Sequence, residues 1–298
     1  MRLVLVCAAT LCCFAGNSLL ARAALGSGAA GAASFTALRL MSGAAVLWLV
    51  SRGRPAAREA GWPSALALFF YAAPFSWAYL HISAGTGALL LFPSVQLAMM
   101  AVGVFHGERP APLQWSGIAV ALCGLAILAL PGVHAPPPAA AAAMIIAGIS
   151  WAYYSIRGKR ARDPIAATAD AFVRSAPLAV AGLAAAFALA PEAAHLTPRG
   201  AALALVSGAL ASGMGYTLWN SILPEITRTT AGVMQLSVPA LAAVGGIVLL
   251  GERPTTRLLV GGGAILAGIA LAVIRPRSRP VAAPPAAATD AGAATGTR

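Results

Sequence analysis

The sequence contains few charged residues, and acidic residues are the scarcest of them. Only 9% of the 298 residues are charged, and just eight are Asp or Glu, whereas an ordinary soluble domain is roughly 25% charged. So few charges cannot cover a water-facing surface, which excludes a soluble globular enzyme and a disordered polar protein. Because 59% of the residues are hydrophobic, the class that remains is an integral membrane protein.

Cysteine and histidine are also scarce, and their arrangement indicates no redox or metal site. The four cysteines lie inside apolar runs without a Cys-x-x-Cys pair, and the four histidines are scattered along the chain. Disulfide frameworks and zinc sites need closely spaced ligands of these types. The sequence therefore predicts neither a metal site nor any other cofactor.

Long apolar stretches make up most of the chain. A helix that crosses a ~30 Å hydrocarbon core needs about 20 apolar residues. Charges and Pro/Gly clusters separate ten such stretches, which predict an all-α integral membrane protein with ten transmembrane helices. The predicted spans are 3–21, 32–50, 62–81, 85–105, 113–131, 138–156, 168–190, 200–220, 228–249 and 257–274. Residues 275–298, rich in Ala, Pro and Arg, are predicted to be a disordered tail.

Positive charges lie unequally on the two sides of these spans. If the N-terminus is inside, thirteen Lys and Arg residues, not counting the distal Arg298, fall on the inner side and four on the outer side. The positive-inside rule then places both termini in the cytoplasm and the protein in the cytoplasmic (inner) membrane. The net charge of +12 is accordingly a topology signal, and we expect the lipid bilayer, not nucleic acid, as the partner.

The two halves of the sequence resemble each other. Gly107-Glu-Arg-Pro110 follows the fourth span and Gly251-Glu-Arg-Pro254 follows the ninth, 144 positions later. Each half contains five spans, and an odd number makes the second copy enter the membrane from the opposite side. The pattern predicts two inverted five-helix repeats, residues 3–131 and 138–274, an architecture suited to alternating access around a midplane site.

Several motifs occur in the order and spacing of one known family. Beside the two Gly-Glu-Arg motifs stand Ser83-Ala-Gly-Thr-Gly-Ala88, Ser150-Trp-Ala-Tyr-Tyr-Ser155 and Gln235-Leu-Ser-Val-Pro239. Together they resemble the EamA-type transporters of the drug/metabolite transporter superfamily, over roughly residues 3–275. The sequence departs from the family at Phe14, where the first span commonly carries Trp.

The resemblance implies a secondary transporter and no enzyme activity. It implies movement of a small-molecule solute, most simply export of amino acids or related metabolites. Three alternatives stay open: a non-transporting membrane scaffold, a membrane-embedded enzyme, and a carrier of phosphate esters or nucleotide sugars. An enzyme needs a nucleophile with a base, a carboxylate pair or metal ligands facing a cavity, and a phosphate carrier needs several cavity cations.

Polar and aromatic side chains at membrane depth are the predicted substrate-binding residues. Burying a polar group in a bilayer is costly, so such groups are often functional, although they also bond neighbouring helices. In the resembled family, spans one, three, four, six, eight and nine surround the central cavity. The predicted residues on these spans are Asn17, Gln96, Trp151, Tyr154, Tyr216 and Gln235.

Arg39 and Arg174 are the only cations well inside predicted spans, and they occupy equivalent places 135 positions apart. They could bind an anionic substrate, or they could have a structural role, and Asp170 could pair with Arg174 at i,i+4. Glu252 is predicted to anchor helix ends in its loop. Small residues in spans five and ten predict close packing there, as a brace at the edge of each half or as the contact of a homodimer.

No acidic residue lies near the middle of a span. Small multidrug antiporters, which belong to the same superfamily, exchange a cationic drug for protons at a glutamate embedded in the membrane. The first span here carries Asn17 instead. The sequence therefore predicts no carboxylate-mediated antiport of protons and cationic drugs, and strong proton-driven efflux of ethidium from vesicles would contradict this.

Overall fold

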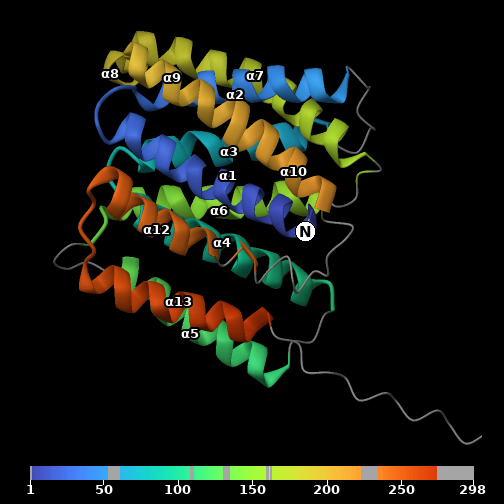
Figure 1. Ribbon diagram of the computed structural model, residues 1–298, viewed down its shortest axis with the longest axis vertical. Coiled ribbons are helices and arrows are strands. Elements are labelled where there is room, and N and C mark those ends of the chain that lie inside the picture. The colour runs from blue at the N-terminus through green and yellow to red at the C-terminus, as the bar shows by residue number, and fades with distance from the viewer. Residues whose placement is uncertain are drawn as a thin grey trace, which may run out of the picture.

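A computed structural model describes residues 2–52, 61–107, 111–129, 135–158, 161, 163–222, 234–235 and 237–273. Within these ranges the secondary structure is helical, apart from one isolated antiparallel bridge between Ala30 and Leu196. The helices lie side by side with their axes roughly aligned, and the loops gather at the two ends of the bundle (Figure 1). The predicted all-α fold is confirmed.

Helix bounds in the first half follow the predicted spans to within a few residues. Pro, Gly and charged residues stand between the helices, where the backbone turns. The helices are α1 (Arg2–Leu25), α2 (Ala32–Ser51), α3 (Gly61–Ala78), α4 (Ala84–Phe105) and α5 (Pro112–Ala129).

The second half contains shorter and more irregular elements. They are α6 (Pro138–Gly158), α7 (Pro164–Leu189), α8 (Pro191–Ala194), α9 (Pro198–Val206), the π-helix η1 (Ser207–Met214), α10 (Gly215–Ile222), α12 (Ser237–Leu250) and α13 (Thr256–Val273). The predicted span 200–220 corresponds to α9, η1 and α10 in direct succession. Residues 228–233 of the predicted ninth span lie outside the described ranges.

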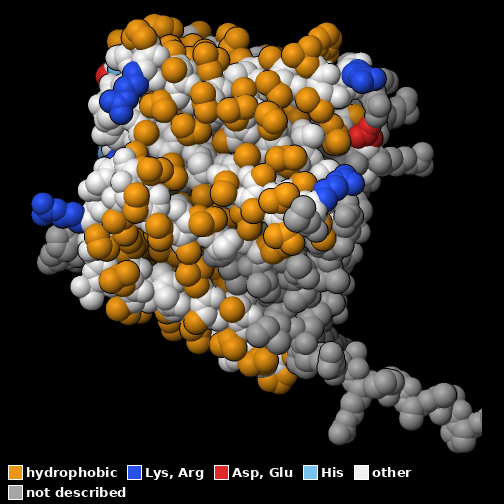
Figure 2. All heavy atoms as spheres, viewed as in Figure 1, with side chains coloured by type: hydrophobic (Ala, Val, Ile, Leu, Met, Phe, Trp, Pro, Cys, Tyr) orange, Lys and Arg blue, Asp and Glu red, His pale blue; other side chains and the backbone are white. Residues whose placement is uncertain are grey.

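The surface carries many large apolar side chains. Trp48, Phe70, Phe105, Phe187 and Val248 are all more than half exposed. Hydrophobic side chains cover the face seen in Figure 2, while Lys and Arg lie toward its margins. An apolar surface of this extent is unfavourable in water and suits contact with lipid.

Six of the described helices are long and apolar enough to cross a membrane. They cover Arg2–Leu25, Ala32–Ser51, Ala84–Phe105, Pro138–Gly158, Ile165–Leu189 and Pro198–Trp219. Three shorter apolar helices cover Pro112–Leu128, Ser237–Leu250 and Thr256–Ala272. The chain is therefore a multi-pass helical membrane protein by length, composition and surface.

Helices α5 and α13 pack on each other at one edge of the bundle (Figure 1). A Cβ atom on Gly268 would lie 2.4 Å from the backbone nitrogen of Ala121, and one on Gly117 would lie 2.5 Å from the carbonyl oxygen of Gly268. Contacts this short leave room only for hydrogen, so these glycines set the distance between the two helices. The close packing predicted for spans five and ten thus joins the two spans to each other.

A polar network ties together the ends of four helices. Arg22, on the last turn of α1, lies 3.3 Å (Nε–Oε1) from Glu252, which follows α12, and its Nη1 donates to the carbonyl oxygen of Tyr79 after α3 at 3.0 Å. The Glu252 carboxylate also accepts from the backbone N–H of Ala84, the first residue of α4, at 2.9 Å. Glu252 is therefore the helix-end anchor that the sequence predicted; its counterpart Glu108 lies outside the described residues.

Candidate functional site

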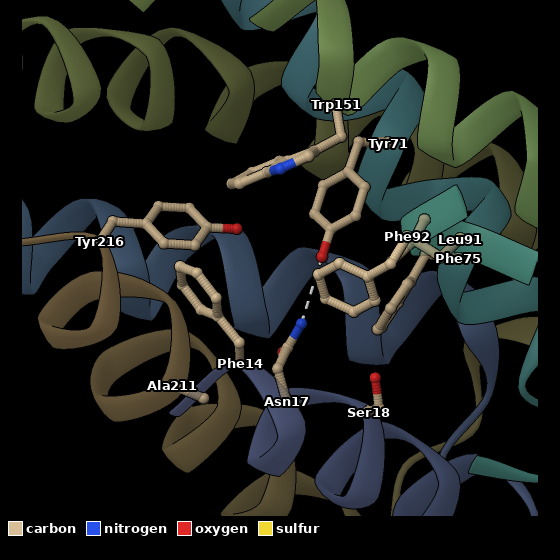
Figure 3. A pocket seen from close by; sticks show the side chains of 10 residues that line it. All are labelled: Phe14, Asn17, Ser18, Tyr71, Phe75, Leu91, Phe92, Trp151, Ala211 and Tyr216. Atoms are coloured by element: carbon tan, nitrogen blue, oxygen red, sulfur yellow. Dashed lines mark hydrogen bonds between the residues drawn. The ribbon is translucent and has the colours of Figure 1, made fainter. Parts of the chain in front are cut away.

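A pocket of about 390 Å³ lies among helices of both halves. It is lined by residues from α1, α3, α4, α6, η1 and α10, that is, from the first, third, fourth, sixth and eighth predicted spans. These residues are Phe14, Asn17, Ser18, Tyr71, Phe75, Leu91, Phe92, Trp151, Ala211 and Tyr216 (Figure 3). A lining of mostly apolar and aromatic side chains with a few polar groups is typical of sites that bind small molecules.

Aromatic rings form most of the pocket wall. The Trp151 ring centroid lies 4.9 Å from that of Tyr71 and 4.8 Å from that of Tyr216, and Phe14 meets Tyr216 edge to face at 5.9 Å. Gly148, one turn before Trp151, brings α6 close to α4, since a Cβ there would lie 2.7 Å from the carbonyl oxygen of Leu91. Rings held by one another make a wall with few alternative rotamers.

Tyr71 is the centre of the polar side of the pocket. Its hydroxyl oxygen accepts a hydrogen bond from Asn17 Nδ2 at 3.2 Å and another from Arg39 Nη2 at 2.9 Å. Asn17 Oδ1 in turn accepts from Ser207 Oγ at 2.7 Å. The bonds therefore connect α1, α2, α3 and η1, and Figure 3 shows the Asn17–Tyr71 bond among the side chains that line the pocket.

The π-helix supplies this network with two hydroxyl groups. Ser207 bonds to Asn17, and Ser212 Oγ accepts from Arg39 Nε at 3.3 Å. The i→i+5 bonding of a π-helix brings residues five apart onto one face, and such segments are frequent at functional sites. Gly208 permits the approach of η1 to α2, because a Cβ there would lie 2.1 Å from the Arg39 carbonyl oxygen.

Arg39 lies behind the pocket wall and is almost completely buried, with 1% of its surface exposed. Its guanidinium carbon is 5.1 Å from the centroid of the Tyr71 ring and 4.7 Å from that of Phe75, both of which face the pocket. Its Nη1 atom is buried without a hydrogen-bond partner among the described residues. The side chain is thus held by two hydrogen bonds and two ring faces, with part of its donor capacity unused.

Arg174 differs from Arg39 in both pairing and place. Its Nε lies 2.8 Å from an Asp170 carboxylate oxygen, and its side chain is 41% exposed, so the predicted i,i+4 ion pair is confirmed. Because α7 begins at Pro164 and not near residue 168, Asp170 lies in the second helical turn. Arg174 is not among the residues that line the pocket.

The structure brings three of the six predicted substrate-binding residues together. Asn17, Trp151 and Tyr216 line the central pocket. Tyr154 lies instead in a second pocket of about 240 Å³ with Ser64 and Thr168 at the end of α6. Gln96 and Gln235 are half-buried and line neither pocket.

Tyr71, Ser207 and Ser212 belong to the site but were not predicted. A signal for the two serines exists in the sequence, because Ser-Gly occurs at 207–208 and again at 212–213. This five-residue spacing equals the i→i+5 hydrogen-bond step of a π-helix. Tyr71 could have been noticed as a hydroxyl in the middle of an apolar span, where it needs a buried partner.

A multi-pass helical bundle with an apolar outer surface and an internal, partly polar pocket defines a membrane protein that binds a small molecule. The EamA-like transporter family matches residues 138–274. The threonine/homoserine exporter RhtA of Escherichia coli is 31% identical over 80% of each chain. This chain belongs to the EamA-like transporter family and hence to the drug/metabolite transporter superfamily.

Two other relatives and one solved structure extend the comparison. An uncharacterized protein of Pseudomonas aeruginosa is 46% identical over 93% of this chain and 96% of its own. A probable terminal-alkyne amino-acid exporter of Streptantibioticus cattleyicolor is 29% identical over 67% of this chain and 68% of its own. A crystal structure with 18% identity superposes with a TM-score of 0.62 over 91% of this chain and 96% of that chain, which shows a shared fold.

Proposed function

We propose that this protein exports amino acids or closely related metabolites across the cytoplasmic membrane by alternating access. The observation that carries the proposal is the pocket of about 390 Å³ that is lined by helices of both halves. A site shared by two halves can open to either side when the halves change their relative position. The names of two relatives, an exporter of threonine and homoserine and a probable amino-acid exporter, support the substrate class.

We propose that the architecture is a pair of inverted repeats. Contacts between α5 and α13 support it: a Cβ on Gly117 would meet the carbonyl oxygen of Gly268, and a Cβ on Gly124 that of Gly261. Gly117 and Gly261 are 144 positions apart, as are Gly124 and Gly268. If each glycine is replaced by the residue 144 positions away in the other half, the first contact becomes the second. A twofold axis between α5 and α13 requires this relation.

Asn17, Trp151 and Tyr216 are the proposed substrate contacts among the predicted residues, and Tyr71 joins them. The aromatic rings offer flat apolar faces, while Asn17 and Tyr71 fix a polar end. A phosphate-ester carrier would need several cations at the site. Among the described residues, Arg39 is the one buried cation that contacts the pocket wall. A single cation favours a substrate with at most one anionic group.

Uptake into proteoliposomes tests the proposal. Purified protein is reconstituted into vesicles preloaded with one unlabelled amino acid at a time, and entry of the same labelled amino acid is measured. We expect counterflow for at least one of them and a loss of at least tenfold in Trp151→Ala, which removes the largest ring of the wall. The matched control is Trp48→Ala on α2, whose side chain is 56% exposed and should leave counterflow unchanged.

Cells provide the complementary measurement. A deletion strain and an overexpressing strain are compared by profiling metabolites inside and outside the cell. The external level of the exported compound should rise with the amount of wild-type protein and not with Trp151→Ala expressed at the same level. Counterflow for none of the twenty amino acids would contradict the proposed substrate class. Equal activity in Trp151→Ala and wild type would contradict the proposed pocket.

A further inference from the structure

We propose that the transported compound carries a carboxylate group, which accepts a hydrogen bond from Tyr71 while Arg39 supplies the opposing charge from behind that ring. The inference rests on the proposed function and names the group that its pocket recognises. In this arrangement Tyr71 is the contact and Arg39 is a positioning residue that acts through it.

The two equivalent arginines show that a counter-charge is missing in the first half. Arg174 has its own carboxylate in Asp170, four residues earlier, whereas the residue four before Arg39 is the fully buried Phe35. Among the described residues Arg39 makes no ion pair. In the second half, the helix that carries Arg174 also supplies the negative charge that pairs with it. In the first half, a negative charge for Arg39 has to come from outside its helix.

Burial makes the missing counter-charge costly. A cation removed from water loses its hydration and is normally paired with an anion. Arg39 is 1% exposed. One serine hydroxyl, one tyrosine hydroxyl and two aromatic ring faces compensate only part of its lost hydration. The unpartnered Nη1 is a second sign that the site is incomplete, because buried donors in folded proteins are almost always satisfied. A substrate carboxylate would bring the negative charge that the structure lacks here.

The direction of the hydrogen bonds leads to the same chemistry. Ser207 donates to Asn17, Asn17 donates to Tyr71, and Arg39 also donates to Tyr71. With two bonds accepted, the Tyr71 hydroxyl has its own hydrogen left to donate. The polar end of the pocket therefore presents a donor backed by a positive charge, and an ionised carboxylate, which only accepts, is the complementary group.

The other end of an amino acid also has a place in the pocket. Among the described residues, those that line the pocket include no carboxylate to pair with an ammonium group. The ring faces of Trp151 and Tyr216 attract cations through their quadrupoles, and Trp is the strongest of the aromatic side chains in this respect. A zwitterion would thus lie with its carboxylate at Tyr71 and its ammonium group toward the aromatic wall.

Competition among three compounds of nearly equal size tests the inference. Uptake of labelled L-threonine into proteoliposomes is measured against unlabelled L-threonine, its methyl ester and threoninol, in which a CH₂OH group replaces the carboxylate. We expect the ester and the alcohol to compete at least tenfold more weakly, the loss that follows from removing one charged hydrogen bond. Equal competition by all three compounds would overturn the inference while leaving amino-acid transport intact.

Variants at Arg39 separate recognition from structure. In Arg39→Gln the preference for threonine over threoninol should fall at least tenfold, and in Arg39→Lys, which keeps the charge, it should be partly retained. A purely structural arginine would reduce the uptake of both compounds together and leave their ratio unchanged, which would overturn the inference. The matched control is Arg174→Gln, outside the pocket, for which we expect the wild-type ratio.

A binding measurement distinguishes failure of this inference from failure of the proposed function. Thermal unfolding of the detergent-solubilised protein is followed with propionate and with propionamide at equal concentration and ionic strength. Stabilisation by propionate alone that disappears in Arg39→Gln supports the carboxylate site even where no amino acid is transported. Equal unfolding temperatures with both compounds in wild type would overturn the site, whatever the transport assay gives.

Discussion

Asn17 is the side chain on which two of the pocket's hydrogen bonds depend. Its amide nitrogen donates to Tyr71 and its amide oxygen accepts from Ser207, so both ends of one amide are used. Asn is suited to this place because it can donate and accept at once without bearing charge. A carboxylate of the same shape could accept at both positions but donate at neither.

We therefore predict that Asn17→Asp lowers amino-acid uptake at least tenfold at unchanged expression. The variant removes the donor to Tyr71, and in its ionised form it adds a negative charge next to Arg39, where it would compete with a substrate carboxylate. Initial rates in proteoliposomes measure the effect. Gln96→Glu is the matched control, since it also converts an amide to an acid but lies outside the pocket; an equal loss there would show that any acid in these helices is harmful.

Individual residues of the site could be predicted only where they contrast with their own span. Asn17 and Trp151 stand out as a polar and a large aromatic group at membrane depth, and both line the pocket. Gln96 stands out equally, yet it is not among the residues that line the pocket. Rotation of each helix about its axis decides which residues meet, and that rotation follows from packing against several neighbours at once, which no single span contains.

Among the elements, the α5–α13 pair offers a close backbone approach that can be tested with two glycines of one helix. A methyl group on Gly268 would lie 2.4 Å from the backbone of Ala121, whereas one on Gly263 of the same helix would meet nothing within 4 Å. We predict that Gly268→Ala destabilises the protein by about 1–3 kcal/mol, the usual cost of overpacking. Gly263→Ala should be neutral or slightly stabilising, because alanine favours helix over glycine.

Thermal unfolding in detergent, read by the fraction that stays monodisperse after heating, compares the two glycine variants. The unfolding temperature of Gly268→Ala should be several degrees below that of Gly263→Ala. Both variants replace glycine by alanine on α13, so the change in helix propensity is the same in each. The difference between their unfolding temperatures therefore measures the effect on packing. Equal temperatures would mean that the two helices can separate at little cost.

Helix positions could be predicted well, and irregular bonding within a helix could not. Proline, glycine and charge mark the ends of α4, α5 and α6 in the sequence, and the helices end near those marks. The span at 200–220 was predicted in the right place, but nothing in its hydropathy separates the π-helix from its α-helical flanks. Its bonding depends on η1 packing against α2, as the contact of Gly208 with Arg39 illustrates.

At the scale of the whole molecule, the Arg22–Glu252 network is the feature that joins distant parts of the chain. Glu252 accepts from the backbone of α4 and pairs with α1, and Arg22 also binds the end of α3. The carboxylate thus connects the loop after α12 to three helices of the first half. The position of Glu252 in the loop after the ninth predicted span predicted an anchoring role, but not which helix ends would be held.

We predict that Glu252→Ala destabilises the protein by about 1–3 kcal/mol, because Arg22 loses its ion-pair partner and the free N–H of Ala84 at the start of α4 loses its acceptor. Glu192→Ala on α8 is the matched control, since that side chain is exposed. Thermal unfolding in detergent should give a clearly lower temperature for Glu252→Ala alone. Comparable values for both variants would show that the network contributes little beyond surface charge.

The glycine contacts between α5 and α13 have one more consequence. If the halves are inverted copies that swap conformations during transport, the Gly117–Gly268 contact in one state becomes the Gly124–Gly261 contact in the other, and the pair looks the same in both. A contact common to both states cannot favour either of them. Substitutions that disturb the α5–α13 contact should then destabilise the inward-open and outward-open forms equally. The folded protein should have a shorter lifetime, but the equilibrium between the two forms should not change. The substrate affinity measured from each side of the membrane should therefore stay the same.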